Sequence, residues 1–248
     1  MRKTVFAKNG YLYSRLRDIT FLRSAWLCIV DLYRMAINPP SAIRKRSDQL
    51  FEQRADPWQY TEPLEQRRMD DALALLAAAK RDGRFNRAIE IGCAEGFFTV
   101  LLAPLCKSLL AVDISSVALE RASSKCRGLC HVRFMRRDVI RDPLAGEFDL
   151  VIVMGVLEYY SRPWDVAKAA RRMIDMTAPG GYLLVSSTRN DAFSEDSWWR
   201  KHLIGGGKWT CAAVARDSRV EIVSTLIGEW WVHSMLRRAT SGSHSQQR

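Results

Sequence analysis

The stretch that decides the fold is AIEIGCAEG, Ala88 to Gly96, in which an apolar run meets one glycine and a second glycine follows four residues later. A short apolar run that ends in glycine indicates a buried strand followed by a tight turn. A phosphate-binding loop would need G-x-x-x-x-G-K-[ST], and no GK[ST] follows Gly96. A dinucleotide fingerprint would need further glycines where Ala94 and Phe97 stand. Neither phosphate-binding pattern is therefore met.

The rest of the chain alternates between short apolar runs and longer helical patterns. Strands are predicted at 87–92, 108–115, 132–139, 148–156 and 182–188, with one or two more in 219–238. Helices are predicted at 63–83, 97–106, 116–126 and 164–176. Strands that are apolar throughout are typical of a parallel sheet covered by helices on both faces. We therefore predict an α/β, doubly wound, mostly parallel sheet, in which ligands bind beyond the carboxyl ends of the strands.

The formal charge of +11 is concentrated at the N-terminal end. Residues 1–54 contain 11 Lys and Arg but only 4 Asp and Glu. Residues 19–37 carry apolar side chains at every third or fourth position, which predicts an amphipathic helix, and NPPSAIRKRS (38–47) indicates a linker. We therefore expect a basic, helical N-terminal extension (1–54), one domain (55–238) and a disordered tail (239–248).

Composition also limits the compartment and the partners. Six cysteines are present without a C-x-x-C pair, so we expect reduced, mostly buried thiols, a cytoplasmic location and no metal site. The longest apolar segment is interrupted by Arg23, Asp31 and Arg34, so no membrane span is predicted. The basic extension is compatible with contact to an anionic membrane surface or to nucleic acid, and also with solubility alone. Nothing in the sequence indicates the oligomeric state.

Glu90, Gly92 and Gly96 form an acidic-x-Gly-x-x-x-Gly pattern at the end of the first predicted strand. With the elements that follow it in order, this pattern resembles class I methyltransferases, which use S-adenosylmethionine, from about residue 55 to residue 190. The resemblance implies a seven-stranded, mostly parallel sheet and S-adenosylmethionine as cofactor. The residues suit this phosphate-free cation, because glycine permits close backbone approach and Glu90 offers a negative charge.

Two further acidic residues end the next two strands. Asp113 lies 21 residues after Gly92, where a carboxylate can accept hydrogen bonds from both ribose hydroxyls. Asp138 lies where the family places an acid that faces the adenine amino group. A helix cap or a surface carboxylate is the alternative for either residue alone. The resemblance implies that the cofactor is bound by Glu90, Gly92, Cys93, Gly96, Asp113, Ile114, Asp138, Val139, Met154 and Gly155.

The residues after the fourth predicted strand should face the transfer site. Methyl transfer is an in-line displacement that depends chiefly on positioning, and a neutral amine acceptor needs no general base. We predict Glu158 and Tyr159 as catalytic residues, with Glu158 orienting an acceptor amine or acting as a base, and Tyr160 as an acceptor contact. A helix-start carboxylate beside packing aromatic rings is the alternative.

A second resemblance narrows the acceptor. ADPWQYTEPLEQRRMDDALALL, residues 55–76, resembles the N-terminal segment of the nodulation-type N-methyltransferases, which act on the free amine of chitooligosaccharide precursors; Asp56, Pro57, Trp58 and Tyr60 carry the match. The resemblance implies that the segment closes over the cofactor, with Trp58 and Tyr60 near the acceptor. We expect methylation of a small molecule or sugar amine, on nitrogen rather than oxygen. A nucleic-acid methyltransferase and a non-catalytic binding subunit with this fold remain alternatives.

Overall fold

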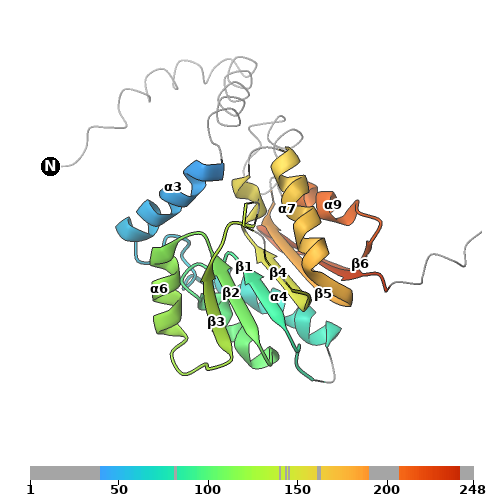
Figure 1. The fold of residues 1–248 in the computed structure, drawn as a ribbon, viewed down its shortest axis with the longest axis horizontal. Coiled ribbons are helices and arrows are strands. Elements are labelled where there is room, and N and C mark those ends of the chain that lie inside the picture. Colours follow the sequence, from blue (N-terminus) through green and yellow to red (C-terminus); the bar gives the residue numbers. More distant parts are fainter. Residues whose placement is uncertain are drawn as a thin grey trace, which may run out of the picture.

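Seven strands form one mixed sheet at the centre of the protein (Figure 1). The computed structural model describes residues 40–80, 83–139, 141–142, 144, 146–160, 163–189 and 207–240. The strands are β1 (Ala88–Ile91), β2 (Leu109–Asp113), β3 (Val132–Arg136), β4 (Phe148–Met154), β5 (Thr177–Thr188), β6 (Val220–Ile227) and β7 (Trp231–Arg238). Their order is β3-β2-β1-β4-β5-β7-β6, and β7 runs antiparallel to the other six strands. The predicted doubly wound, mostly parallel seven-stranded sheet is confirmed.

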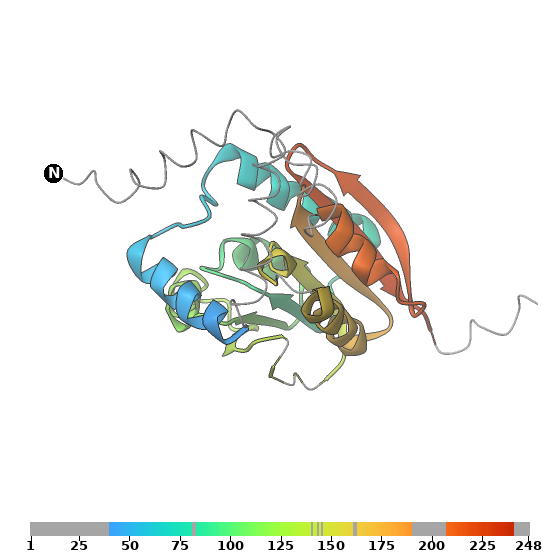
Figure 2. The same ribbon diagram turned by 90° about the horizontal axis from the view of Figure 1, so that it is seen from above.

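Helices cover both faces of the sheet (Figure 2). They are α3 (Pro40–Gln53), α4 (Pro63–Ala79), α5 (Phe97–Leu102), α6 (Ser116–Lys125), α7 (Pro163–Met176) and α9 (Gly207–Ala215), with the 3-10 turns η1 (Ala103–Leu105) and η2 (Leu157–Tyr159). On one face, α4 and α5 pack through Met69, Leu76 and Leu102. On the other face, α7 and α9 pack through Met173 and Val214. This double cover explains why every residue of β4 from Leu150 to Val153 is fully buried.

Two local predictions are wrong. Residues 40–47 of the predicted linker are helical instead, because α3 begins at Pro40; proline is tolerated in the first turn of a helix, and no helix-breaking residue follows it within α3. The fifth strand begins at Thr177 rather than at residue 182, since it runs through the APGG segment with an irregular register against β4. The helix predicted at 19–37 and most of the predicted tail, 241–248, lie outside the described residues.

Candidate active site

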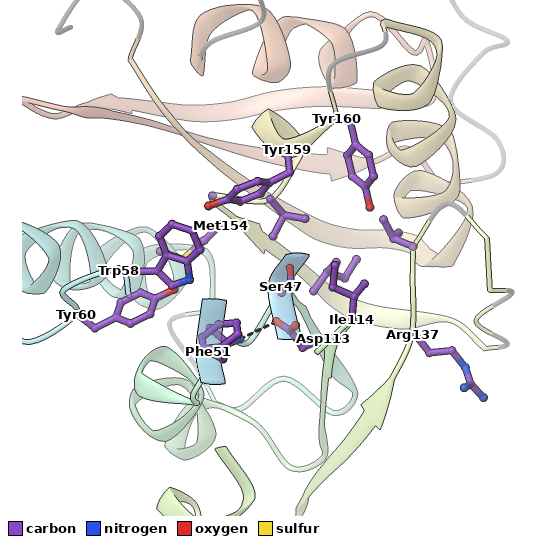
Figure 3. Close-up of a pocket in the computed structure, with 16 residues that line it drawn as sticks. Ser47, Phe51, Trp58, Tyr60, Asp113, Ile114, Arg137, Met154, Tyr159 and Tyr160 are labelled. Atoms are coloured by element: carbon purple, nitrogen blue, oxygen red, sulfur yellow. Dashed lines mark hydrogen bonds between the residues drawn. The ribbon is translucent and has the colours of Figure 1, made fainter. Parts of the chain in front are cut away.

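A cavity opens at the carboxyl ends of β1, β2 and β4, at the edge of the sheet where the sequence predicts the ligand site (Figure 3). Of the predicted site residues, the ten that line it are Trp58, Tyr60, Gly92, Asp113, Ile114, Val139, Met154, Gly155, Tyr159 and Tyr160. The other five lie outside the lining: Glu90, Cys93, Gly96, Asp138 and Glu158. The fold thus brings together side chains from separate strand ends and from the segment that precedes the sheet.

Asp113 is the carboxylate in the cavity wall. Its two oxygens each accept one backbone hydrogen bond, from the N–H of Ala94 and from the N–H of Ser115, both at 2.9 Å. The side chain is buried, and burial raises the pKa of the carboxyl group despite these hydrogen bonds. Each oxygen keeps a second lone pair, so the carboxylate can accept two more hydrogen bonds from a ligand.

The glycine turn leaves the backbone bare where it meets the cavity. Gly92 has φ +78°, and a Cβ there would lie 2.2 Å from a methyl carbon of Val156, so no other residue fits without rearrangement. Ala94 also has a positive φ, 46°, which costs free energy for a residue with a Cβ. Its N–H is thereby directed at Asp113. The strained turn and the carboxylate therefore form one unit.

Three of the predicted residues lie outside the cavity lining and pack in or next to this turn. A Cβ on Gly96 would lie 3.0 Å from the Cβ of Ala122, so this glycine allows α5 to pack against α6. Cys93 is buried in the core. Glu90 is buried, and its carboxyl group accepts a 2.6 Å hydrogen bond from the Thr99 hydroxyl. Burial raises the pKa of Glu90 to about 7. The charge predicted to face the cofactor is therefore held behind the turn, outside the cavity lining.

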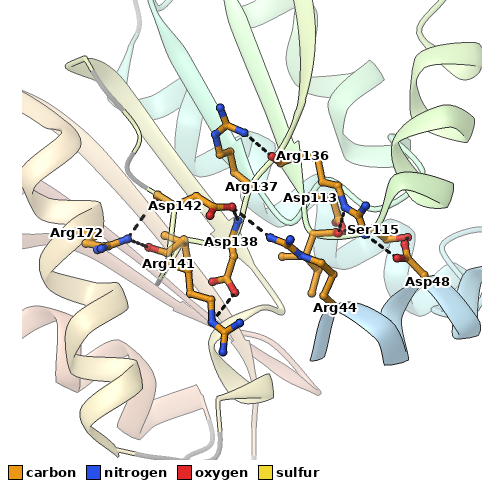
Figure 4. Close-up of polar contacts among 12 residues, drawn as sticks. Arg44, Asp48, Asp113, Ser115, Arg136, Arg137, Asp138, Arg141, Asp142 and Arg172 are labelled. Atoms are coloured by element: carbon orange, nitrogen blue, oxygen red, sulfur yellow. Dashed lines mark hydrogen bonds and ion pairs between the residues drawn. The ribbon is translucent and has the colours of Figure 1, made fainter. Parts of the chain in front are cut away.

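Asp138 lies in the loop that follows β3 (Figure 4). Its backbone N–H donates a 2.9 Å hydrogen bond to the Asp142 carboxylate, and its own carboxylate lies 3.8 Å from the Arg141 guanidinium. Its neighbours Arg137 and Val139 line the cavity, whereas Asp138 does not. The loop is thus braced by its own charged side chains.

Helix α3 forms a further wall of the cavity. Its Asp48 carboxylate accepts hydrogen bonds from the Ser115 hydroxyl at 2.7 Å and from Arg136 at 2.7 Å (Figure 4). These bonds hold α3 beside the strand end that carries Asp113, and they let Ser47 and Phe51 reach the cavity. The basic N-terminal region therefore contributes directly to the site.

Aromatic rings form a further part of the cavity lining (Figure 3). The rings of Trp58 and Tyr159 are 5.7 Å apart, between centroids, and tilted by 56°. Burial raises the pKa values of Tyr60, Tyr159 and Tyr160, so all three remain neutral phenols. Glu158 stands behind this wall, where its carboxylate accepts hydrogen bonds from Ser187 at 3.0 Å and Thr188 at 3.2 Å.

Residues 45–228 match the model of the Nodulation protein S (NodS) family. The chain belongs to the NodS family. It is 35% identical over 137 residues to Nodulation protein S of Bradyrhizobium diazoefficiens, covering 55% of this chain and 64% of that one. It is 33% identical over 136 residues to Nodulation protein S of Rhizobium tropici, covering 54% and 56%. The match thus spans less than two thirds of these curated relatives.

A solved NodS structure extends the comparison. The crystal structure of N-methyltransferase NodS from Bradyrhizobium japonicum WM9 in complex with S-adenosyl-L-homocysteine superposes with a TM-score of 0.66 and 26% identity. The match covers 77% of this chain and 98% of that one. Magnesium protoporphyrin IX methyltransferase from Synechocystis, at 17% identity and a TM-score of 0.62, shares the fold. The predicted resemblance to the nodulation-type family is confirmed.

Six residues in the lining of this NodS-family cavity escaped the sequence analysis: Ser47, Phe51, Ile91, Ala94, Arg137 and Val156. Four of them adjoin predicted residues, so a wider window around each strand end would have included them. Ser47 and Phe51 had no such signal, because α3 was interpreted as part of a linker and an extension.

Proposed function

We propose that this NodS-family chain is an S-adenosylmethionine-dependent methyltransferase that methylates the nitrogen of a small, sugar-bearing amine. The observation that carries the proposal is the buried Asp113 carboxylate, which lines the cavity beside the bare backbone of Gly92. The relative crystallised with S-adenosyl-L-homocysteine supports the choice of cofactor.

The residues present fit this cofactor. Asp113 has lone pairs for two ribose hydroxyls, and the apolar side chains of Ile114 and Val139 suit the faces of an adenine ring. Met154 and Gly155 line the region beside them, which we assign to the methionine moiety. Bound there, the cofactor supplies an electrophilic methyl group, while the chain supplies orientation and exclusion of water.

We assign supporting roles to the predicted cofactor residues outside the lining. Gly96 and Cys93 set the packing of the turn, and Glu90 holds it through Thr99. Asp138 stabilises the loop that carries Arg137 and Val139. Direct contact between any of these four and the cofactor stays a prediction.

The aromatic wall favours a sugar-bearing acceptor. Trp58, Tyr60, Tyr159 and Tyr160 offer ring faces for the apolar face of a pyranose and for a cationic amine. No histidine is among the described residues that line the cavity, and an amine acceptor, unlike a hydroxyl, needs no general base. An amine needs only to lose its proton and be aimed at the methyl group, and we propose that Glu158 assists in both.

A two-step experiment tests the proposal. Calorimetry with S-adenosylhomocysteine should show binding that Asp113→Ala weakens by about 10- to 150-fold. Transfer of a labelled methyl group should then occur to a chitooligosaccharide with a free non-reducing-end amine, and not to the same oligosaccharide fully N-acetylated. No binding would favour the non-catalytic alternative, and transfer to RNA in preference to both sugars would favour the nucleic-acid one.

The partners of the N-terminal extension stay predictions. No helix among the described residues is long and apolar enough to cross a bilayer. Residues 1–39, which hold much of the positive charge of the extension, lie outside the described part. We propose a small-molecule acceptor as the partner and the cytoplasm as the compartment, the latter on the cysteine usage alone. Anionic vesicles that retain the full chain at low salt would support peripheral membrane contact.

A further inference from the structure

Arg68 is a buried, positively charged residue of α4 close to the proposed transfer site. The residue is only 8% exposed, and its guanidinium forms an ion pair with Glu65 at 2.7 Å. Its Nε–H has no hydrogen-bond partner among the described residues. Burying an incompletely satisfied guanidinium costs free energy, and an apolar side chain at this place would avoid that cost. The arrangement therefore calls for a role beyond packing.

The same region holds other unsatisfied polar atoms. The Ser186 hydroxyl and both ring nitrogens of His233 are buried without hydrogen-bond partners among the described residues. The two residues stand opposite each other across β5 and β7, so their side chains lie on the same face of the sheet. Burial, and next the charge of Arg68, lower the pKa of His233 to about 4, so the ring is neutral. The charged partner of the Arg68 guanidinium is thus Glu65 and not His233.

On its other side, Arg68 reaches the turn that follows β4. Its NH1 atom lies 3.3 Å from the point where a Cβ on Gly155 would stand, and a Glu158 carboxylate oxygen lies 3.8 Å from that same point. Gly155 has φ +65° and lines the cavity. The Arg68 guanidinium and the Glu158 carboxylate therefore both lie within 4 Å of the place where Gly155 lacks a side chain.

Charge reinforces this geometry. Arg68 is paired with Glu65 and lies near the same glycine as Glu158. Burial raises the pKa values of Glu65 and Tyr159, and the charge of Arg68 opposes that rise. Without the guanidinium, two carboxylates would share a low-dielectric region and repel each other. This repulsion would displace the Glu158 carboxylate from its present position.

We propose that Arg68 is the positioning residue of the transfer site, where it fixes the turn from Gly155 to Tyr159 and thereby holds Tyr159 in the cavity lining and Glu158 directly behind it. The inference rests on the proposed function. Arg68 is absent from the cavity lining, so it acts through the turn and not by touching the acceptor.

The test compares Arg68→Met and Arg68→Lys with the matched control Arg67→Met. Arg67 is the neighbouring residue on α4, its side chain is 64% exposed, and its ion-pair contact with Glu229 is long at 3.9 Å. In Arg68→Met we expect kcat for the amine acceptor to fall about 10- to 100-fold, as for small misplacements of reacting groups. We expect affinity for S-adenosylhomocysteine to stay within about twofold, since the groups assigned to the cofactor are untouched. Arg68→Lys should restore part of kcat, and Arg67→Met should change nothing.

Hydrogen exchange of the segment 154–160 gives a readout that does not need activity. It should speed up in Arg68→Met and not in Arg67→Met. A parallel fall of cofactor affinity would overturn the proposal by assigning Arg68 to the cofactor, and unchanged kcat with unchanged exchange would overturn it outright. If Arg68→Met does not fold, Glu65→Gln replaces it and should speed exchange of the same segment. A native protein that methylates no acceptor refutes the proposed function, while the exchange result still decides the positioning role.

Discussion

Replacing Asp113 with alanine separates the two tasks of its carboxylate. In the folded chain it accepts the N–H groups of Ala94 and Ser115, both at 2.9 Å. In the complex it would also accept two ribose hydroxyls. The first task contributes to stability and the second to affinity, so the two losses can be measured apart.

The binding loss follows from the hydroxyl contacts. Hydrogen bonds to a charged group contribute about 1.5–3 kcal/mol, so Asp113→Ala should weaken S-adenosylhomocysteine binding by about 10- to 150-fold. The loss of stability should be smaller than two buried, unpartnered N–H groups alone would cause, at about 1–3 kcal/mol each. The reason is that burial also penalises the ionised carboxylate, as its raised pKa indicates, and alanine removes that penalty.

Asp149 provides the matched control. Its carboxylate also accepts two backbone N–H groups, those of Asn86 and Arg87, both at 2.8 Å, but it is not in the cavity lining. Asp149→Ala should lower the midpoint of urea unfolding and leave calorimetric affinity unchanged. If Asp113→Ala binds S-adenosylhomocysteine as tightly as the native chain, the assignment of Asp113 to the ribose is refuted.

Three further changes test the turn and α3. Burial raises the pKa of Glu90 to about 7 from an ordinary 4.5, so the stability that its protonated form contributes is lost as pH rises between these values. In urea unfolding, Glu90→Gln should therefore be about 3 kcal/mol more stable than the native chain at pH 8 and equal to it near pH 4. Equal stability at pH 8 would contradict the burial argument. Gly92→Ala should abolish cofactor binding, and adding Val156→Ala should rescue it only in part, because the positive φ persists; full rescue would show that overlap alone matters. Asp48→Ala, which removes the contact with Arg136, should speed hydrogen exchange in α3 and weaken cofactor binding, whereas unchanged exchange would mean that α3 is held by other contacts.

The sheet could be predicted because its signal is local. A strand such as β4, with four consecutive buried residues, must be apolar throughout, and a strand-to-helix turn at Gly92 must use glycine. The position of α3 could not be predicted in this way. Its start at Pro40 looks like a break in the chain, and the contact that holds it, Asp48 with Arg136, joins residues 88 positions apart.

The site shows the same division between local and distant signals. The place of Asp113 at a strand end predicts that it faces the cavity, because the residues that donate to it, Ala94 and Ser115, belong to the adjoining turn and to the same strand end. The same reasoning predicts Glu90 at the cofactor, which stays a prediction; in the structure its buried carboxyl group accepts a hydrogen bond from the Thr99 hydroxyl on α5. Position along a strand tells which end a residue occupies, whereas a partner on a packed helix decides where its side chain is held.

These observations assign cofactor and acceptor to different parts of the chain. The proposed cofactor cradle consists of strand ends, and structures with as little as 17% identity share the fold that presents them. Of the residues proposed for the acceptor side, Trp58, Tyr60 and the positioning residue Arg68 come from residues 55–76, which precede β1, and Glu158, Tyr159 and Tyr160 follow β4. The match to the NodS family begins at residue 45 and so includes this segment. Acceptor choice should therefore depend on this segment as well as on the turn after β4, and exchanging residues 55–76 between two NodS-family proteins should alter acceptor preference more than cofactor affinity.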